Sequence, residues 1–258
     1  MDISGKNIVV TGAASGIGRA LSRRFRAEGA AKLVITDVNA EGLELVAKEI
    51  GADAIAADMG SEADVTNFIA QAEQSLGQID LLCNNAGISI PGGPEVSTED
   101  WQTIWQINVM AHIWATRAAL PNMLKRGDGY LLHTASAAGL LTQIGSAPYA
   151  VTKHAAVAYA EWLAITYGDQ GLKVSALCPQ AVRTAMTAGH EDGVASIDGM
   201  MEPEVLCDAV IATLAREAFL VLPHPEVETY IQRKAGDYDR WLSGMRRLQT
   251  QYGAPEWP

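Results

Sequence analysis

The sequence has little cysteine and no long hydrophobic run. Its three cysteines, Cys83, Cys178 and Cys207, lie far apart and form no Cys-x-x-Cys pair, which excludes a paired disulfide framework and an obvious zinc knuckle. No stretch approaches the ~20 apolar residues that a helix needs to cross a bilayer. Residues 1–6 are polar and do not resemble a leader peptide. We therefore expect a cytoplasmic protein with no membrane span and no metal site.

Positive charge is also scarce. The 19 Lys and Arg residues against 30 Asp and Glu residues give a formal net charge of −11. This charge repels phosphate polymers and anionic membrane surfaces, so we expect neither a nucleic-acid nor a membrane partner. With 258 residues, 48% of them hydrophobic, the chain has enough material for a large core.

Short runs of β-branched and aliphatic residues recur along the chain and predict buried strands. They cover residues 8–10, 33–35, 54–57, 81–83, 130–133, 174–178 and 219–222. Stretches with helical spacing lie between them and end at glycines such as Gly29 and Gly77. Strands that are apolar on both faces and alternate with helices predict an α/β fold, a Rossmann-type doubly wound sheet of about seven parallel strands with helices on both faces.

Length alone would allow one domain or two. The chain has no Pro/Ser-rich linker, low-complexity run or internal repeat. We therefore predict a single domain over residues 1–258, with a C-terminal helical tail at about 225–258.

The first predicted strand runs into a glycine-rich turn, Thr-Gly-Ala-Ala-Ser-Gly-Ile-Gly, at residues 11–18. A helix follows at once, so backbone N–H groups and the helix dipole favour a phosphate there, and glycines let a pyrophosphate approach closely. The spacing of Gly12, Gly16 and Gly18 differs from the commoner Gly-x-Gly-x-x-Gly. A tight turn without a ligand is the alternative.

Polar residues follow the next three predicted strands. Asp37 ends the second strand, where a carboxylate can accept hydrogen bonds from both hydroxyls of an adenosine ribose and would repel a 2′-phosphate. Asp58 ends the third strand and could meet the adenine amino group. Either acid could instead cap the following helix. The segment 84–87, Asn-Asn-Ala-Gly, ends the fourth strand, so the sequence predicts a ligand site at this sheet edge.

A second group of residues follows the fifth predicted strand. Ser136 comes just after it, and Tyr149 and Lys153 lie four residues apart in a predicted helix with Pro148 in its first turn. The phenol has a reference pKa of about 10, and a nearby ammonium would favour the phenolate. Such a tyrosine can exchange a proton with an alcohol or ketone oxygen, which Ser136 would hold. A Tyr-x-x-x-Lys pair alone also occurs on many surface helices.

Over roughly residues 6–186 the chain resembles the short-chain dehydrogenase/reductase family. The resemblance implies that the glycine turn holds NAD(P), that Asn-Asn-Ala-Gly stabilises the central sheet, and that Ser136, Tyr149 and Lys153 form the catalytic triad. Asn108, in Ile-Asn-Val, matches the fourth catalytic residue, which keeps a water by Lys153. The cofactor contacts that it implies are Gly12, Ser15, Gly16, Ile17, Gly18, Asp37, Asp58, Met59, Asn85, Ala86, Gly87, Tyr149, Lys153, Pro179, Val182 and Thr184.

We therefore expect an NAD-dependent oxidoreductase that interconverts a secondary alcohol and a ketone. Its expected substrate is a small hydrophobic alcohol or ketone that meets Ser136, Met186 and His190. The resemblance also implies a homodimer or homotetramer. The chain departs from the family pattern at Gln180, where the family's Pro-Gly motif has glycine. An NAD-dependent sugar-nucleotide epimerase or dehydratase and a non-catalytic NAD-binding scaffold are the alternatives.

Overall fold

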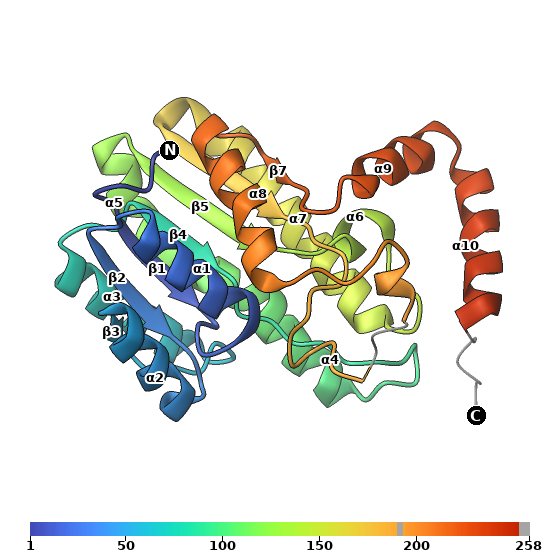
Figure 1. The fold of residues 1–258 in the computed structure, drawn as a ribbon, viewed down its shortest axis with the longest axis horizontal. Helices are drawn as coiled ribbons and strands as arrows, with labels where there is room; N and C mark the ends of the chain where they lie inside the picture. Colours follow the sequence, from blue (N-terminus) through green and yellow to red (C-terminus); the bar gives the residue numbers. More distant parts are fainter. Residues whose placement is uncertain (190–192, 253–258) are drawn as a thin grey trace.

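The computed structural model describes residues 1–189 and 193–252. Its centre is one parallel sheet of seven strands in the order β3-β2-β1-β4-β5-β6-β7 (Figure 1). The strands are β1 Asn7–Thr11, β2 Lys32–Thr36, β3 Asp53–Ala54, β4 Leu81–Asn84, β5 Gly129–Thr134, β6 Leu172–Leu177 and β7 Leu220–Val221. The predicted doubly wound sheet is confirmed.

Helices connect the strands and cover both faces of the sheet. They are α1 Gly16–Ala27, α2 Ala40–Ile50, α3 Glu62–Leu76, α4 Thr98–Trp105, α5 Ala111–Arg126, α6 Ala138–Leu141, α7 Ala147–Tyr167, α8 Pro203–Arg216, α9 Glu226–Gly236 and α10 Tyr238–Tyr252. Short helical turns of other types cover η1 Gln106–Met110, η2 Gly168–Gln170 and η3 Val194–Ser196. No helix of the described residues is long and apolar enough to cross a membrane.

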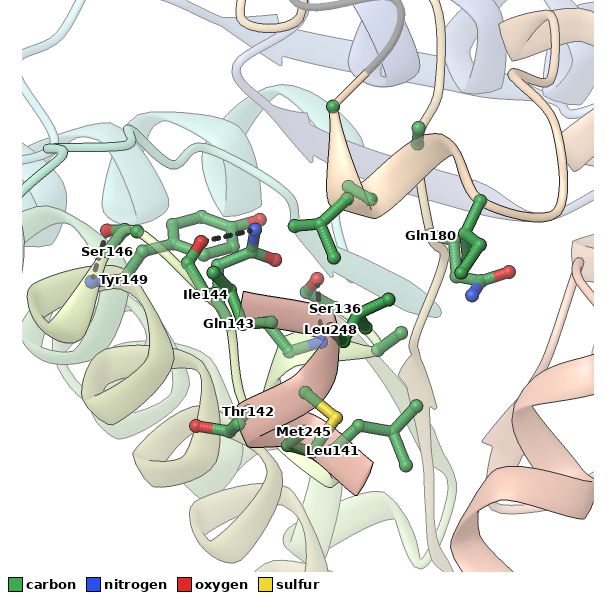
Figure 2. Close-up of a pocket in the computed structure, with 18 of the residues that line it drawn as sticks. Ser136, Leu141, Thr142, Gln143, Ile144, Ser146, Tyr149, Gln180, Met245 and Leu248 are labelled. Carbon is green, nitrogen blue, oxygen red and sulfur yellow. Dashed lines mark hydrogen bonds between the residues drawn. The ribbon is translucent and has the colours of Figure 1, made fainter. Parts of the chain in front are cut away.

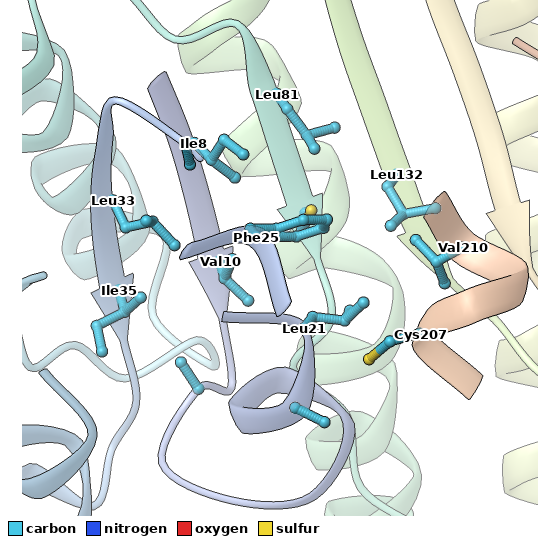
Figure 3. Close-up of a cluster of buried hydrophobic side chains, with 14 of the residues drawn as sticks. Ile8, Val10, Leu21, Phe25, Leu33, Ile35, Leu81, Leu132, Cys207 and Val210 are labelled. Atoms are coloured by element: carbon cyan, nitrogen blue, oxygen red, sulfur yellow. The ribbon is translucent and has the colours of Figure 1, made fainter. Parts of the chain in front are cut away.

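Two large apolar clusters hold these layers together. On one face, Leu21 and Phe25 of α1 and Val210 of α8 pack on Ile8 and Val10 of β1 (Figure 3). On the other face, α3, α5 and α7 contribute a second cluster that includes Phe68, Trp114 and Leu163. Every strand between the edges is therefore buried on both sides, which explains why the strand segments read as continuous apolar runs.

The third strand is shorter than predicted. The sequence indicates residues 54–57, whereas β3 covers only Asp53–Ala54. It is an edge strand with β2 as its one neighbour, so pairing on one side alone holds it. The Ile55 N–H still donates to the Ile35 carbonyl at 3.0 Å, which keeps the chain beside β2 as it leaves the sheet.

The direction of the strand order reverses between β1 and β4. From β1 the chain proceeds to β2 and β3 on one side, and from β4 it proceeds to β5, β6 and β7 on the other. The connections that leave the carboxyl ends of β1 and β4 therefore diverge and leave a crevice between them. The glycine turn and the Asn-Asn-Ala-Gly segment both begin at this point.

The C-terminal helices lie outside these layers. Val227 of α9 is buried and packs against Ala137 and Leu141 next to α6. Helix α10 has no buried residue, and Figure 1 shows it standing away from the sheet at the far end of α9. The C-terminal tail is therefore attached to the rest of the molecule through α9, and α10 extends from α9 without packing on the sheet.

Candidate active site

The glycine turn after β1 is packed so tightly that two of its glycines leave no room for a side chain. A Cβ on Gly12, whose φ is +67°, would lie 2.9 Å from the Ala86 Cα, and one on Gly18 would lie 2.0 Å from the Gly12 carbonyl oxygen. The first backbone bond into α1 is from the Arg19 N–H to the Ser15 carbonyl at 3.1 Å. The Ser15 side chain makes no cap bond. The first-turn N–H groups of α1 and the Ser15 hydroxyl can therefore bind a phosphate.

The carboxylate of Asp37 faces this turn. One of its oxygens accepts a hydrogen bond from the Ala14 N–H at 3.0 Å, and the other accepts one from the Asn39 N–H at 2.9 Å. The alternative in which Asp37 caps α2 is wrong, because the N-cap is Asn39, whose side chain accepts from the Gly42 N–H at 3.1 Å. The exposed Val38 follows, so no basic side chain comes directly after the acid.

Asp58 does not cap a helix either. Its carboxylate accepts from the Gly60 N–H at 2.8 Å, while Ser61 is the N-cap of α3. Asp58 is exposed at the end of the segment that follows β3, and Met59 beside it is buried. Both predicted adenosine contacts therefore lie at the sheet edge with no structural cap role.

The segment after β4 is fixed beside the glycine turn by hydrogen bonds. The Thr11 hydroxyl accepts from the N–H groups of Asn85 and Ala86 at 2.9 and 3.0 Å. The Asn85 side chain donates to the Thr11 carbonyl at 3.0 Å and accepts from the Thr134 hydroxyl at 3.1 Å. These bonds join the ends of β1, β4 and β5, as the resemblance implies for the central sheet.

The loop after β6 reaches the glycine turn from the other side. A Cβ on Gly16 would lie 3.0 Å from the Thr184 Cγ2, so the two residues are neighbours. Val182 pairs with Met201 in a short parallel bridge. The Thr184 N–H donates to the Thr187 hydroxyl at 3.1 Å. The backbone of this loop is therefore held where it can border a cofactor.

Gln180 is accommodated where the family pattern has glycine. Its N–H donates to the His224 Nδ1 at 3.2 Å, and its amide nitrogen donates to Asp198 at 2.9 Å. Gln180 is not among the described residues with positive φ, so this backbone does not need a glycine. His224 and Asp198 were not predicted. The only sequence feature that could have drawn attention to His224 is its position between two prolines, in Leu-Pro-His-Pro directly after β7.

Tyr149 and Lys153 lie on the same side of α7. The Lys153 Nζ is 5.6 Å from the centroid of the Tyr149 ring and donates to the Thr134 carbonyl at 3.0 Å. Helix α7 begins after Ser146, whose hydroxyl accepts from the Tyr149 N–H at 3.3 Å. This cap and the proline in the first turn fix the tyrosine at the start of the helix.

Ser136 approaches the same phenol from the end of β5. Its hydroxyl accepts from the Ala138 N–H at 3.1 Å and donates to the Pro179 carbonyl at 3.4 Å. Burial raises the pKa of Tyr149, and a hydrogen bond with Ser136 opposes this shift. The sequence predicted a lowered pKa. The structure gives the opposite direction because burial disfavours the phenolate.

Burial lowers the pKa of Lys153 to about 8. The ammonium is almost fully enclosed, with 3% of the residue exposed, and an enclosed site disfavours the charged form of a lysine. Lys153 can therefore change its protonation state close to neutral pH, which suits a group that passes protons.

Asn108 lies in a π-helical turn, η1, between α4 and α5. Its side chain accepts from the Ile88 N–H at 2.8 Å and donates to the Ile88 carbonyl at 2.9 Å and to the Thr152 hydroxyl at 3.1 Å. A Cβ on Gly87 would lie 3.2 Å from both the Asn108 Oδ1 and the Lys153 Nζ. Asn108 therefore positions the Gly87–Ile88 backbone against the lysine. The pattern of the sequence alone gave no sign of the π turn.

A cavity of about 1620 Å³ opens in front of Ser136 and Tyr149. Ile144 borders it, as do Met245 and Leu248 of α10 (Figure 2). Met186, a predicted substrate contact, is also among the lining residues. His190, the other predicted substrate contact, lies outside the described residues. Among the residues that the structure describes, no three His, Cys, Asp or Glu side chains gather as a metal site requires.

The short chain dehydrogenase family model matches residues 6–194. A 1-deoxy-11-beta-hydroxypentalenate dehydrogenase of Streptomyces avermitilis is 34% identical, over 99% of this chain and 97% of its own length. A meso-2,3-butanediol dehydrogenase of Serratia marcescens is 33% identical, over 84% and 90%. The crystal structure of a short chain dehydrogenase/reductase from Burkholderia phymatum in complex with NAD superposes with a TM-score of 0.85 and 25% identity, over 100% of this chain and 99% of that one.

Proposed function

The chain belongs to the short-chain dehydrogenase family, and we propose how its own residues carry out the reaction. The protein is an oxidoreductase that interconverts alcohol and ketone groups by hydride transfer. The observation that carries the proposal is that Ser136 and Tyr149 line one cavity together with Gly87 and Ile88. Lys153 and Asn108 lie directly behind this backbone, each 3.2 Å from the place of a Cβ on Gly87.

The residues around the turn fit a dinucleotide. The first-turn N–H groups of α1 and the Ser15 hydroxyl would hold the pyrophosphate, and Asp37 would accept hydrogen bonds from the adenosine ribose. Asp58, Met59 and the loop with Val182 and Thr184 would complete the contacts. When bound, the nicotinamide supplies the hydride acceptor or donor.

The protein's share of the reaction is orientation and proton transfer. Tyr149 takes the hydroxyl proton in oxidation and returns it in reduction, and Ser136 holds the substrate oxygen by a hydrogen bond. Lys153 would hold the ribose hydroxyls of a bound cofactor beside Tyr149, and in its charged form it would favour the phenolate. Because burial raises the pKa of Tyr149, alcohol oxidation speeds up as pH rises above neutral.

We propose NAD over NADP as the preferred cofactor. Asp37 sits within hydrogen-bonding distance of the turn that would hold the cofactor, and its negative charge opposes a phosphate on the same ribose. Ser15 in the turn and Val38 after the acid carry no positive charge that could pair with a 2′-phosphate. Two solved relatives are described with NAD or NADH, the Burkholderia phymatum enzyme and a 3-ketoacyl-(acyl-carrier-protein) reductase from Brucella melitensis.

We also propose a homodimer or homotetramer and a cytoplasmic location. Large apolar side chains stay exposed on two neighbouring helices, Trp105 on α4 and Trp162 and Ile165 on α7, the last with 78% of its surface in solvent. A second copy that covers these side chains would remove apolar surface from water. The free, buried cysteines Cys83 and Cys178 are consistent with a reducing compartment.

The proposal is tested with purified protein, NAD and a panel of secondary alcohols. We expect reduced nicotinamide to appear with several alicyclic or aliphatic alcohols and to be consumed with the matching ketones. Sugar nucleotides should give no turnover. Tight NAD binding without reduction by any alcohol would instead favour the non-catalytic scaffold.

A further inference from the structure

The tail forms a wall of the substrate cavity opposite the catalytic residues. Trp241, Met245 and Leu248 of α10 all border the cavity, and their spacing of four and three residues places them on one helix face. The ring of Trp241 lies 6.4 Å from that of Tyr230 in α9, which itself packs on the domain through Val227. The wall is therefore joined to the rest of the molecule.

This wall carries positive charge into the cavity. Arg233 of α9 and Arg240 and Arg247 of α10 border the cavity, whereas Asp237 is the one acidic residue among its described lining residues. None of the three arginines forms an ion pair within the described part of the chain. The Arg233 guanidinium lies over the Tyr230 ring at 5.8 Å. Arg247 also donates to the Ser243 hydroxyl at 3.1 Å, and Asp198 accepts from the Tyr230 hydroxyl at 3.0 Å. Among the described residues, three arginines thus lie near two acids, Asp198 and Asp237, and this excess of positive charge can attract an anion in a chain with a net charge of −11.

The remainder of the lining restricts what this anion can be. Leu141, Ile144, Met186, Met245 and Leu248 make the space between the catalytic residues and the arginines largely apolar. Guanidinium groups pair with carboxylates through two parallel hydrogen bonds. Asp237 accepts from the Arg240 N–H at 2.9 Å, so its carboxylate sits at the start of α10. There it repels a dianion such as a phosphate ester more strongly than a singly charged carboxylate.

Resting on the proposed function, we propose that the substrate is a bulky apolar secondary alcohol or ketone with a carboxylate at its far end. The reacting oxygen lies at Ser136 and Tyr149, the apolar body fills the cavity, and the carboxylate binds among Arg233, Arg240 and Arg247. The arginines position the substrate and do not take part in proton transfer.

Turnover of matched substrates tests this inference. The probes are decanoate with a hydroxyl on its penultimate carbon, the methyl ester of this hydroxy acid, and the corresponding phosphate monoester of a decanediol. We expect kcat/KM with the hydroxy acid to exceed that with the ester by about fivefold, the upper end for one ion pair at a solvent-exposed site. Raising the ionic strength should reduce this preference.

Charge-removing variants identify the residues. In a triple variant with Arg233→Gln, Arg240→Gln and Arg247→Gln, the preference for the acid should disappear while kcat/KM with the ester stays within about twofold. Arg246→Gln is the matched control, because Arg246 is an exposed arginine of α10 that does not border the cavity. Equal kcat/KM for acid and ester in the wild-type protein, or a greater preference for the phosphate, overturns the inference while the oxidoreductase function stands.

Binding provides a readout that does not depend on turnover. Calorimetric titration of the NAD-saturated protein with decanoate should give a Kd about tenfold lower than in the triple variant, and Arg246→Gln should match the wild type. A Kd that the triple variant leaves unchanged contradicts the carboxylate site even if the enzyme oxidises every alcohol. Decanoate binding that depends on the arginines, without any alcohol oxidation, would support the site and refute the proposed reaction.

Discussion

At the scale of single residues, the buried lysine of the candidate site destabilises the fold, and the rest of the fold offsets this cost. Lys153 is enclosed, and burial lowers its pKa from 10.5 to about 8. A lysine whose folded pKa lies below its unfolded pKa destabilises the fold at low pH by up to about 3 kcal/mol, at ~1.4 kcal/mol per pKa unit. This cost is complete below pH 8 and disappears as pH rises toward 10.5.

We predict that this cost appears in the pH dependence of thermal stability. The Tm of the Lys153→Met variant, relative to that of the wild type, should be highest below about pH 8. This relative Tm should fall as pH rises to about 10.5, because the wild-type ammonium then loses its proton and the wild type becomes more stable. Lys125→Met, which removes an exposed lysine of α5, is the control. A Tm difference between Lys153→Met and wild type that does not change with pH would contradict the burial argument.

A second residue-scale prediction concerns Asp37 and cofactor choice. The kcat/KM with NAD should exceed that with NADP by at least about a hundredfold, or ~2.7 kcal/mol. Asp37→Ala should shrink the ratio, since it weakens NAD binding and removes the repulsion of the 2′-phosphate. Glu41→Ala, an exposed acid in the first turn of α2, should leave the ratio unchanged. A wild-type preference for NADP would contradict this role of Asp37. Its carboxylate would then serve only to bind the N–H groups of Ala14 and Asn39.

At the scale of elements, the strands and their order of appearance could be predicted because each is a short apolar run between helical segments. The edge strand was overestimated, since Ala56 and Ala57 look apolar in sequence but have no second neighbouring strand to pair with. The π turn that holds Asn108 could not be predicted, because its widened geometry depends on packing against Ile88 and Thr152 rather than on local sequence. The place of α10 likewise depends on tertiary contacts of α9.

The glycine turn yields an element-scale prediction. A Cβ on Gly18 would lie 2.0 Å from the Gly12 carbonyl, so Gly18→Ala must displace backbone. We expect it to cost about 1–3 kcal/mol of stability, the range for overpacked sites, and to weaken NAD binding at least about tenfold. Chemical denaturation and calorimetry measure these effects.

Gly168→Ala is the matched control for this substitution. Nothing lies within 4 Å of an added Cβ there, and its φ of −55° is helical, so the variant should match or slightly exceed wild-type stability. Equal NAD affinity in Gly18→Ala and Gly168→Ala would refute the assignment of the turn as the pyrophosphate site.

At the scale of the whole molecule, the sheet order brings the site together. Gly12, Asn85, Ser136 and Thr184 lie at one edge of the sheet because they follow β1, β4, β5 and β6, which all end there. That meeting could be predicted from the sequence once the parallel sheet was inferred. The width of the cavity and the presence of arginines in its lining could not be predicted from the sequence. Both depend on how α9 and α10 are placed after β7.

The proposed oligomer gives a prediction for the whole molecule. Light scattering at micromolar concentration should give the molar mass of a dimer or a tetramer. Ile165→Glu should shift it toward smaller species, because it places a charge on the exposed apolar surface of α7. Leu45→Glu, on the exposed face of α2, should not. A wild-type protein that is monomeric at this concentration would contradict the proposed oligomer.

We propose Tyr149 as the proton-exchanging group of this oxidoreductase, and the Tyr149→Phe variant tests this role. The variant keeps the ring and loses only the hydroxyl that Ser136 faces. Single-turnover and steady-state kinetics with NAD and an accepted alcohol should show kcat reduced by ~10²–10⁴-fold, the usual contribution of general acid–base catalysis, with the Kd for NAD nearly unchanged. A variant that retains more than about a tenth of wild-type kcat would contradict the claim.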